Sequence, residues 1–220
     1  MPHSAKLGLL LLLCGSTALP QRLISARAGT VDYSRGASFI DGQRVILFRN
    51  KLLVLKNGQT LQTRAGRIEV LLGEGVFLRM GDTSSIRMDE NRYADTRVAI
   101  ETGFALIEVA RIAKDARLHI TCGDLTTELK APGQYRFDAD PCGLRVYRGE
   151  LSVDRDGGIQ KAKVGQVFSF TGTPSLTRFD PKETDPVKTW ADQRSRQRTQ
   201  REKHLEEQRS MQAKRRSLMH

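Results

Sequence analysis

The chain has 220 residues and a formal net charge of +11 at pH 7, with a sequence pI near 10.0. Most of the positive excess lies in residues 1–28 and in the stretch after Asp180, while the length between them, about 150 residues, is enough for one domain with a buried core. A pI this high is typical of nucleic-acid-binding proteins, but the export signal at the N-terminus argues against nucleic acid as a partner.

The N-terminus has the pattern of a secretory signal peptide. Lys6 precedes the apolar run Leu7–Cys14, and small-x-small sites end at Ala18 and Ala28. A membrane-spanning helix needs roughly 20 consecutive apolar residues, so this run is too short to be one. We therefore expect cleavage after Ala18 or Ala28 and a periplasmic or secreted protein. The alternatives are lipid attachment at Cys14 and a retained anchor.

Removal of the signal peptide leaves an even pair of cysteines, Cys122 and Cys142. In an oxidising compartment such a pair is a candidate disulfide. The bridge would close a loop of about 20 residues and contribute roughly 3 kcal/mol. The alternative is two unpaired thiols in a β-rich core. A metal site is not expected, because two cysteines without a nearby histidine supply too few ligands.

Residues 29–180 alternate apolar and polar side chains and are interrupted by turn residues at intervals of roughly 6 to 12 residues. An Asn57–Gly58 pair is typical of the turns that close hairpins. The pattern predicts a mainly β domain of stacked antiparallel hairpins, either a sandwich or a solenoid-like roll. The segments expected to be strands are 53–55, 67–72, 76–80, 104–110, 118–121, 125–129, 134–137, 144–147, 150–153 and 164–170.

The last segment, residues 181–220, has no glycine and is dense in Arg, Gln, Glu and Lys. Asp185 as a cap and Pro186 at the first helical position predict a helix over 187–217. We expect this basic tail to be helical or partly disordered, because its apolar residues are too sparse to form a core-facing stripe. Trp190 is expected to hold the start of the helix against the β domain.

No catalytic residue, cofactor or metal ion is expected, so the chain is predicted not to be an enzyme. His119 lies between apolar strand residues, and neither it nor His204 has a catalytic partner at a recognised spacing. Asp138 and Asp140 could contribute oxygen ligands to calcium, but two carboxylates are few for such a site. A solvated turn is the preferred interpretation.

Two sets of basic residues are candidate binding surfaces. Arginines that alternate with apolar residues are expected on the outward face of strands, either solvated or facing an anionic ligand; these are Arg79, Arg87, Arg136 and Arg145. The tail is expected to offer a surface for anionic envelope polymer or lipid, unless it is a merely solvated helix. Its cluster consists of Arg194, Arg196, Arg198, Arg201, Lys214, Arg215 and Arg216.

Residues 61–88 resemble the FecR domain family. The residues that carry the resemblance are Thr63, Gly66, Glu69, Gly75, Leu78, Arg79, Asp82 and Ser84, and it extends over most of residues 40–195. It implies a non-enzymatic interaction or sensing module in the bacterial cell envelope, with an unknown protein or envelope ligand as partner. The alternative is an envelope-surface binder that adsorbs through its basic tail.

The family's namesake is implied to link an outer-membrane iron-siderophore transporter to a cytoplasmic sigma factor. That function needs a cytoplasmic segment ahead of a membrane helix. Only a few residues precede the apolar run Leu7–Cys14, and the run is shorter than a membrane helix. We therefore expect the domain type and the compartment to carry over, but not the sigma-factor role.

Overall fold

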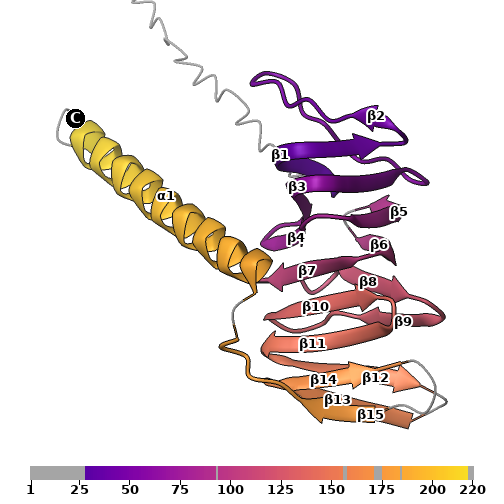
Figure 1. Cartoon of the computed structure of the whole chain (residues 1–220). Helices are drawn as coiled ribbons and strands as arrows, with labels where there is room; N and C mark the ends of the chain where they lie inside the picture. The colour runs from indigo at the N-terminus through magenta and orange to yellow at the C-terminus, as the bar shows by residue number, and fades with distance from the viewer. Residues whose placement is uncertain (1–27, 93, 156–157, 171–174, 184, 218–220) are drawn as a thin grey trace, which may run out of the picture.

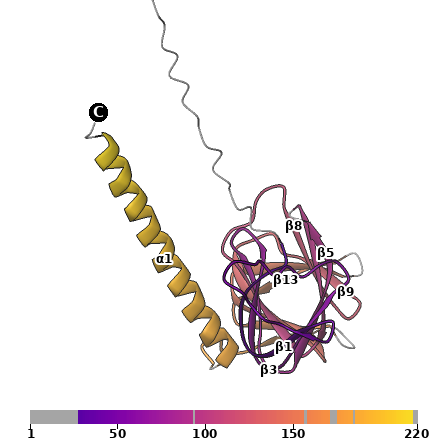
Figure 2. The ribbon, with the colours of Figure 1, turned by 90° about the horizontal axis from the view of Figure 1, so that it is seen from above.

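The computed structural model describes residues 28–92, 94–155, 158–170, 175–183 and 185–217. The expected signal peptide and Cys14 lie outside these residues. The strands stack along one axis and curl into a roll, and a single long helix leans away from its side (Figures 1 and 2). The predicted fold class, mainly β with stacked antiparallel hairpins and a C-terminal basic helix, is confirmed.

Most of the strands belong to one continuous sheet. Its order is β15-β14-β11-β10-β7-β4-β3-β5-β6-β8-β9, with β1 paired to β3 and β2 paired to β1, while β12 and β13 form a separate ribbon. The bounds are β1 Thr30–Ile40, β2 Gln43–Arg44, β3 Thr60–Gly73, β4 Val76–Met80, β5 Ser84–Arg92, β6 Asp95–Thr102, β7 Phe104–Val109, β8 Arg117–Cys122, β9 Leu125–Glu128, β10 Gly133–Ala139, β11 Cys142–Arg148, β12 Glu150–Arg155, β13 Gly158–Lys163, β14 Gln166–Ser169, β15 Ser175–Arg178 and the helix α1 Pro186–Ser217.

The roll turns at a pair of facing glycines in β1 and β3. Gly36 and Gly66 are register partners, with φ angles of 94° and 138°. A Cβ atom on Gly66 would lie 2.1 Å from the carbonyl oxygen of Arg35. Only glycine permits this approach and this conformation without strain. Before the bend β3 pairs with β5, and after it with β4.

Strand β4 is buried on both of its faces. In β4, Val76, Leu78 and Met80 point into the roll, and the two residues between them, Phe77 and Arg79, are also buried. A strand exposed on one face would leave the intervening residues in water. The base of α1 contacts β4 and covers this second face, so β4 is buried on both sides.

Several details differ from the sequence prediction. Residues 53–55 form no ladder strand, and Val54 makes only an isolated bridge to Thr30, although Asn57–Gly58 does form a turn. The sequence pattern predicts no strand in the regions that form β1, β2, β5, β6, β13 and β15. The ladder between β6 and β8 is parallel, because the chain passes through β7 before β8 returns beside β6.

The helix begins where the sequence predicts. The Asp185 carboxylate accepts hydrogen bonds from the backbone N–H groups of Val187 and Lys188, at 2.8 and 3.0 Å. Such a cap satisfies donors that the first helical turn leaves unpaired. The same carboxylate binds the guanidinium of Arg136 and the hydroxyl of Tyr147, each at 2.8 Å, which joins the cap to β10 and β11.

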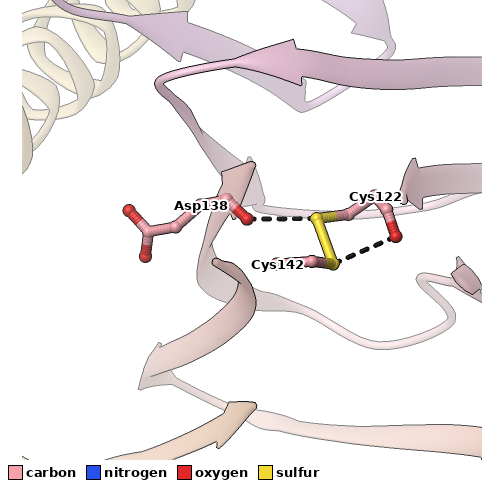
Figure 3. The surroundings of a disulfide bond; sticks show 3 residues. All are labelled: Cys122, Asp138 and Cys142. Carbon is pink, nitrogen blue, oxygen red and sulfur yellow. Dashed lines mark hydrogen bonds between the residues drawn. A yellow bond between two sulfur atoms is a disulfide. The ribbon is translucent and has the colours of Figure 1, made fainter. Parts of the chain in front are cut away.

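Cys122 and Cys142 lie together, at the end of β8 and the start of β11 (Figure 3). Their sulfur atoms are bonded, and their Cα atoms are 5.9 Å apart. This Cα separation is usual for a disulfide. The two strands share no backbone ladder, so the bridge joins parts of the roll that backbone hydrogen bonds do not connect directly.

We propose that this disulfide forms in the exported protein. In a thiol assay of the denatured, unreduced protein, neither Cys122 nor Cys142 should react as a free thiol. Replacing both with serine should lower the free energy of unfolding by about 3 kcal/mol, because the unfolded chain regains a loop of about 20 residues. Urea unfolding with and without reductant measures the effect, and a reductant-insensitive midpoint in the unmodified protein would contradict it.

Candidate functional site

The base of α1 packs on the outward face of the roll through a small apolar cluster. Trp190 is 6% exposed, and its ring lies 5.5 Å from that of Tyr33 in β1. Burying so large an aromatic side chain contributes a large share of the docking energy of the helix. The cluster consists of Leu106, Tyr147, Val187, Trp190 and Ala191, with Tyr33, Phe104 and Phe179 packed around it.

Beside this cluster, a fully buried arginine binds two carboxylates. Arg79 in β4 donates from Nε to Glu69 in β3 at 2.6 Å and from Nη1 to Glu108 in β7 at 2.7 Å. The helix joins the network through Ser195, whose hydroxyl donates to Glu108 at 2.5 Å and accepts from Arg79 at 3.1 Å. Because buried charges are stable only when paired and hydrogen-bonded, each member requires the others.

Two helix arginines extend the network to the edge of the roll. Arg194 and Arg198 both donate to Glu69, at 2.8 and 2.6 Å. Arg194 also binds Asp32 in β1 at 3.1 Å, and the guanidinium carbon of Arg198 lies 3.4 Å from the ring centre of Phe77. The carboxylates of the roll are therefore matched by guanidinium groups from the helix, in addition to the cation–π contact.

The network shifts the acidity of its carboxylates. Burial raises the pKa of Glu69, but the hydrogen bond from Arg194 and the charges of Arg79 and Arg198 outweigh it and lower the pKa to about 2. Burial and the neighbouring Glu69 raise the pKa of Asp32, against the lowering effect of Arg198 and Arg194. Glu69 is therefore ionised in the folded protein at any pH near neutrality.

This shift predicts acid-sensitive docking. The folded pKa of Glu69 lies below its unfolded value of 4.5, so its contribution is full above pH 4.5 and is lost as the pH falls toward about 2. The lost stability should be about 3 kcal/mol. Urea unfolding between these pH values measures it. An Asp32→Asn background removes the opposing titration of Asp32. In this background, adding Glu69→Gln should flatten the dependence of the free energy of unfolding on pH, and an unchanged dependence would contradict the assignment.

The structure divides the seven predicted tail residues into three groups. Arg194 and Arg198 are half-buried and bind the roll, so they are internal contacts and not a free anionic-ligand surface. Arg196 is exposed and lines a hollow of about 720 Å³ between the helix base and the roll, which Arg148 and Lys182 also line. The exposed remainder, on the distal half of the helix, consists of Arg201, Lys214, Arg215 and Arg216.

The distal half of α1 projects away from the roll (Figures 1 and 2). Every residue from Thr199 to Ser217 is exposed. Two apolar side chains of this part, Leu205 and Met211, are 44% and 56% exposed. We call residues 199–217 the helical arm. It is held at its base and presents basic and scattered apolar side chains to solvent.

The arginines expected on a solvated strand face occupy different environments. That expectation is wrong for Arg79, which α1 buries completely. Arg136 is partly buried and binds Asp138 and Asp185, while Arg145 also reaches Asp138. The Asp138 carboxylate is therefore bound by two arginines and is not a solvated turn residue. Arg87 and Arg145, with side chains 46% and 38% exposed, match the expected exposed position.

Glu108 and Ser195 are members of the site that the sequence pattern does not predict. Glu108 lies two residues after Leu106 in β7 and therefore on the same face of the strand. Ser195 lies one helical turn after Ala191 and therefore on the same face of the helix. Once both elements are known, these spacings place each residue at the contact between the helix and the roll. Glu69 entered only through the family resemblance, and Arg79 through that resemblance and as an outward-facing strand arginine. The available sequence signal was that charged residues of opposite sign, Glu69, Arg79 and Glu108, occupy outward positions on strands.

Among the described residues, no three or more His, Cys, Asp or Glu side chains gather where they could hold a metal ion. His119 in β8 lies 4.0 Å from Asp95 and is partly buried. The described part of the chain also contains no helix with the length and apolar character needed to cross a bilayer.

No family model and no curated protein matches the chain. Two solved structures resemble part of it, both described as candidate anti-sigma factors from Parabacteroides distasonis ATCC 8503. The structure at 2.50 Å resolution gives a TM-score of 0.47 at 16% identity, over 56% of this chain and 61% of that one. The structure at 1.65 Å gives 0.49 at 16% identity, over 60% and 64%. The chain thus spans less than two thirds of either structure, and a likeness at this level establishes neither a shared fold nor a shared function.

Proposed function

We propose that the protein is a non-enzymatic interaction or sensing module of the FecR type in the bacterial cell envelope, in which the roll holds the helical arm for a protein partner. The observation that carries this proposal is the contrast within one helix. Residues up to Arg198 are bound to the roll by Trp190 and the Arg79 network, whereas residues 199–217 are all exposed.

The energetics support a partner for the arm. Isolated helices are marginal in water, and most helix stability in proteins comes from packing of an apolar face. The arm has no packed face, and Leu205 and Met211 lie six residues apart on its exposed surface. Because this spacing places the two side chains about 120° apart around the helix, a partner that buries both must wrap around the arm. Anchoring the base reduces the ordering cost of such binding.

Site-specific photo-crosslinking in cells tests the proposal. A crosslinking amino acid placed at Leu205 or at Met211 should give the same discrete adduct. The matched control is Leu176, which is 47% exposed in β15 at the far end of the roll and should not give that adduct. Adduct formation at Leu176 equal to that on the arm, or no adduct from either arm position, would overturn it.

The location of the protein is part of the proposal. The described roll begins at Ala28, which is 1% exposed, and Gly29 N–H donates to the Leu71 carbonyl at 2.8 Å. Cleavage after Ala28 would place a charged amino terminus in this buried position, so we propose Ala18 as the cleavage site. N-terminal sequencing of the periplasmic fraction should begin at Leu19. Full-length protein in the cytosol, or a lipid-modified Cys14, would contradict it.

A second candidate function is adsorption of the arm to anionic envelope polymer or lipid. The last turn of α1 carries Lys214, Arg215 and Arg216, and none of them takes part in a described ion pair. If this function holds, replacing all three with glutamine should abolish a salt-sensitive association with envelope fractions. Retention of the discrete Leu205 adduct by the same variant would instead favour the protein partner.

A further inference from the structure

The connection between β2 and β3 lies at the β1 end of the roll (Figure 1). It carries several exposed large apolar side chains. The exposed fractions are 59% for Ile46, 38% for Leu47, 63% for Phe48 and 63% for Leu52. We call residues 44–56 the tip loop. Single exposed apolar residues are common on proteins, but a contiguous group on one loop marks an interaction surface.

The tip loop is held in place by its own backbone. Its apolar residues flank a tight turn in which Lys51 N–H donates to the Phe48 carbonyl at 3.3 Å. The fully buried Leu55 anchors its end in the core. Three backbone hydrogen bonds, each 2.8 Å long, join its base to the first strand region: Val45 N–H to Ser38, Val31 N–H to Leu53, and Leu55 N–H to Gly29. The apolar side chains are thus presented on a fixed base.

Basic side chains predominate around the apolar residues. Arg44, Arg49, Lys51 and Lys56 are all exposed, and none takes part in an ion pair among the described residues. The nearby Asp41 carboxylate already accepts hydrogen bonds from the Gln59 side chain and the Thr60 backbone, at 2.8 and 2.9 Å. The loop therefore has an apolar centre and a rim with a net positive charge, four basic side chains against the single carboxylate of Asp41.

A hollow of about 450 Å³ lies under the tip. Apolar side chains, among them Ile46, Phe48 and Leu52, line it, and its charged lining residues are Arg44, Lys51, Lys56 and the single acidic residue Asp41. Apolar walls with cationic groups at the rim match the chemistry of a lipid at a membrane surface, where an acyl chain adjoins an anionic headgroup.

We propose that the tip loop docks the protein on an anionic lipid bilayer, with Phe48, Leu52 and Ile46 in the headgroup–acyl boundary and the basic rim on the phosphates. Charge complementarity selects this occupant. A second copy of the chain would bring two basic rims together, which is unfavourable. The tip loop is separate from the helical arm, so this inference stands whether or not the arm binds a protein.

The position of α1 is compatible with this docking. Figure 1 shows the distal end of the helix at the level of the β1–β2 end of the roll, and not at the β15 end. The basic residues of its last turn therefore lie toward the same side as the tip loop. A bilayer that receives the tip would attract these residues as well, which adds to the affinity without replacing the loop.

A tryptophan reporter tests the insertion directly. The Phe48→Trp variant of the full chain is mixed with vesicles of phosphatidylglycerol and phosphatidylcholine, or of phosphatidylcholine alone, with brominated acyl chains. The added fluorophore should shift to the blue and be quenched only in the anionic vesicles, while the buried Trp190 gives a constant background. Absence of quenching in anionic vesicles would overturn the proposal. A concentration-dependent blue shift without lipid would also overturn it, in favour of contact between copies.

A matched pair of charge variants separates specific docking from general attraction. Arg49→Gln with Lys51→Gln should weaken partitioning into the anionic vesicles about 30-fold, since each basic residue near the surface contributes about a fivefold factor. Lys163→Gln with Arg178→Gln removes the same charge from exposed residues at the far end of the roll, and partitioning should change less than about threefold.

The apolar contribution has its own control. Phe48→Ser should weaken partitioning by about tenfold, because one interfacial aromatic side chain stays in water. Ile159→Ser, which alters a side chain 71% exposed in β13, should leave partitioning unchanged. Equal effects of the near and far variants, in either the charge pair or the apolar pair, would show that the tip loop is not the docking surface.

Discussion

Replacing Arg79 with methionine is expected to lower the free energy of unfolding by about 3–5 kcal/mol, the largest effect of any single charged-residue change. The side chain is fully buried, and its removal leaves Glu108 with only the longer contact to Arg148, at 3.5 Å, and takes one of three guanidinium partners from Glu69. Equilibrium unfolding in urea at pH 7 measures the change. Below pH 4.5 the difference should shrink, because Glu69, whose folded pKa is lowered to about 2 partly by the charge of Arg79, contributes less to the stability of the unmodified protein there.

Arg87→Met is the matched control for this prediction. Arg87 also pairs with two carboxylates, Asp89 and Glu101, but its side chain is 46% exposed. Exposed pairs contribute about 0–1 kcal/mol, so this variant should be nearly neutral. The double variant Arg79→Met with Glu69→Gln should cost less than the sum of the single variants, because the charge left behind is removed. Equal effects at Arg79 and Arg87 would contradict a buried network.

Replacing Trp190 with alanine is expected to cost about 3–5 kcal/mol and to release the helix from the roll. Trp190 is the single tryptophan of the chain and packs with Tyr33, Leu106 and Tyr147 at the base of α1. Because the arm has no other packed face, helix content should fall together with docking. Hydrogen exchange should show faster exchange over residues 186–198, while the β core keeps its protection.

Leu205→Ala provides the comparison. Leu205 is an apolar residue on the same helix, but it is 44% exposed and outside the docking cluster. Its replacement should change the free energy of unfolding by less than about 0.5 kcal/mol. If Trp190→Ala and Leu205→Ala have similar effects on exchange over residues 186–198, the helix is not anchored by the cluster.

Local sequence patterns predicted the parts of the fold that depend on neighbouring residues. The bounds of β4 follow from Gly75 before Val76 and Gly81 after Met80, since glycines end the alternating segment on both sides. The start of α1 follows from Asp185 and its proline successor, because an N-cap acts within one helical turn. The same kind of local pattern overestimated the segment 53–55, where no strand partner continues the ladder.

Contacts between distant residues were not predictable in the same way. Period-two alternation shows that Arg79 points away from the core, but it does not show what covers that face. The helix that buries Arg79 begins more than 100 residues later, and its contact partner Ser195 is 116 residues away. The parallel pairing of β6 with β8 likewise depends on the path of the whole sheet. Both results follow from packing of elements that are not adjacent in sequence.

The sequence by itself determined that the chain is a β domain followed by a basic helix, with a signal-like N-terminus and a pair of cysteines. These properties depend on residue type, periodicity and caps over short spans. Only the tertiary structure decided which basic residues are free. Arg194 and Arg198 bind the roll, whereas Arg201 and the tip-loop residues Arg49 and Lys51 face solvent. The physical reason is that a charge is available to a partner only where folding has not already paired or buried it.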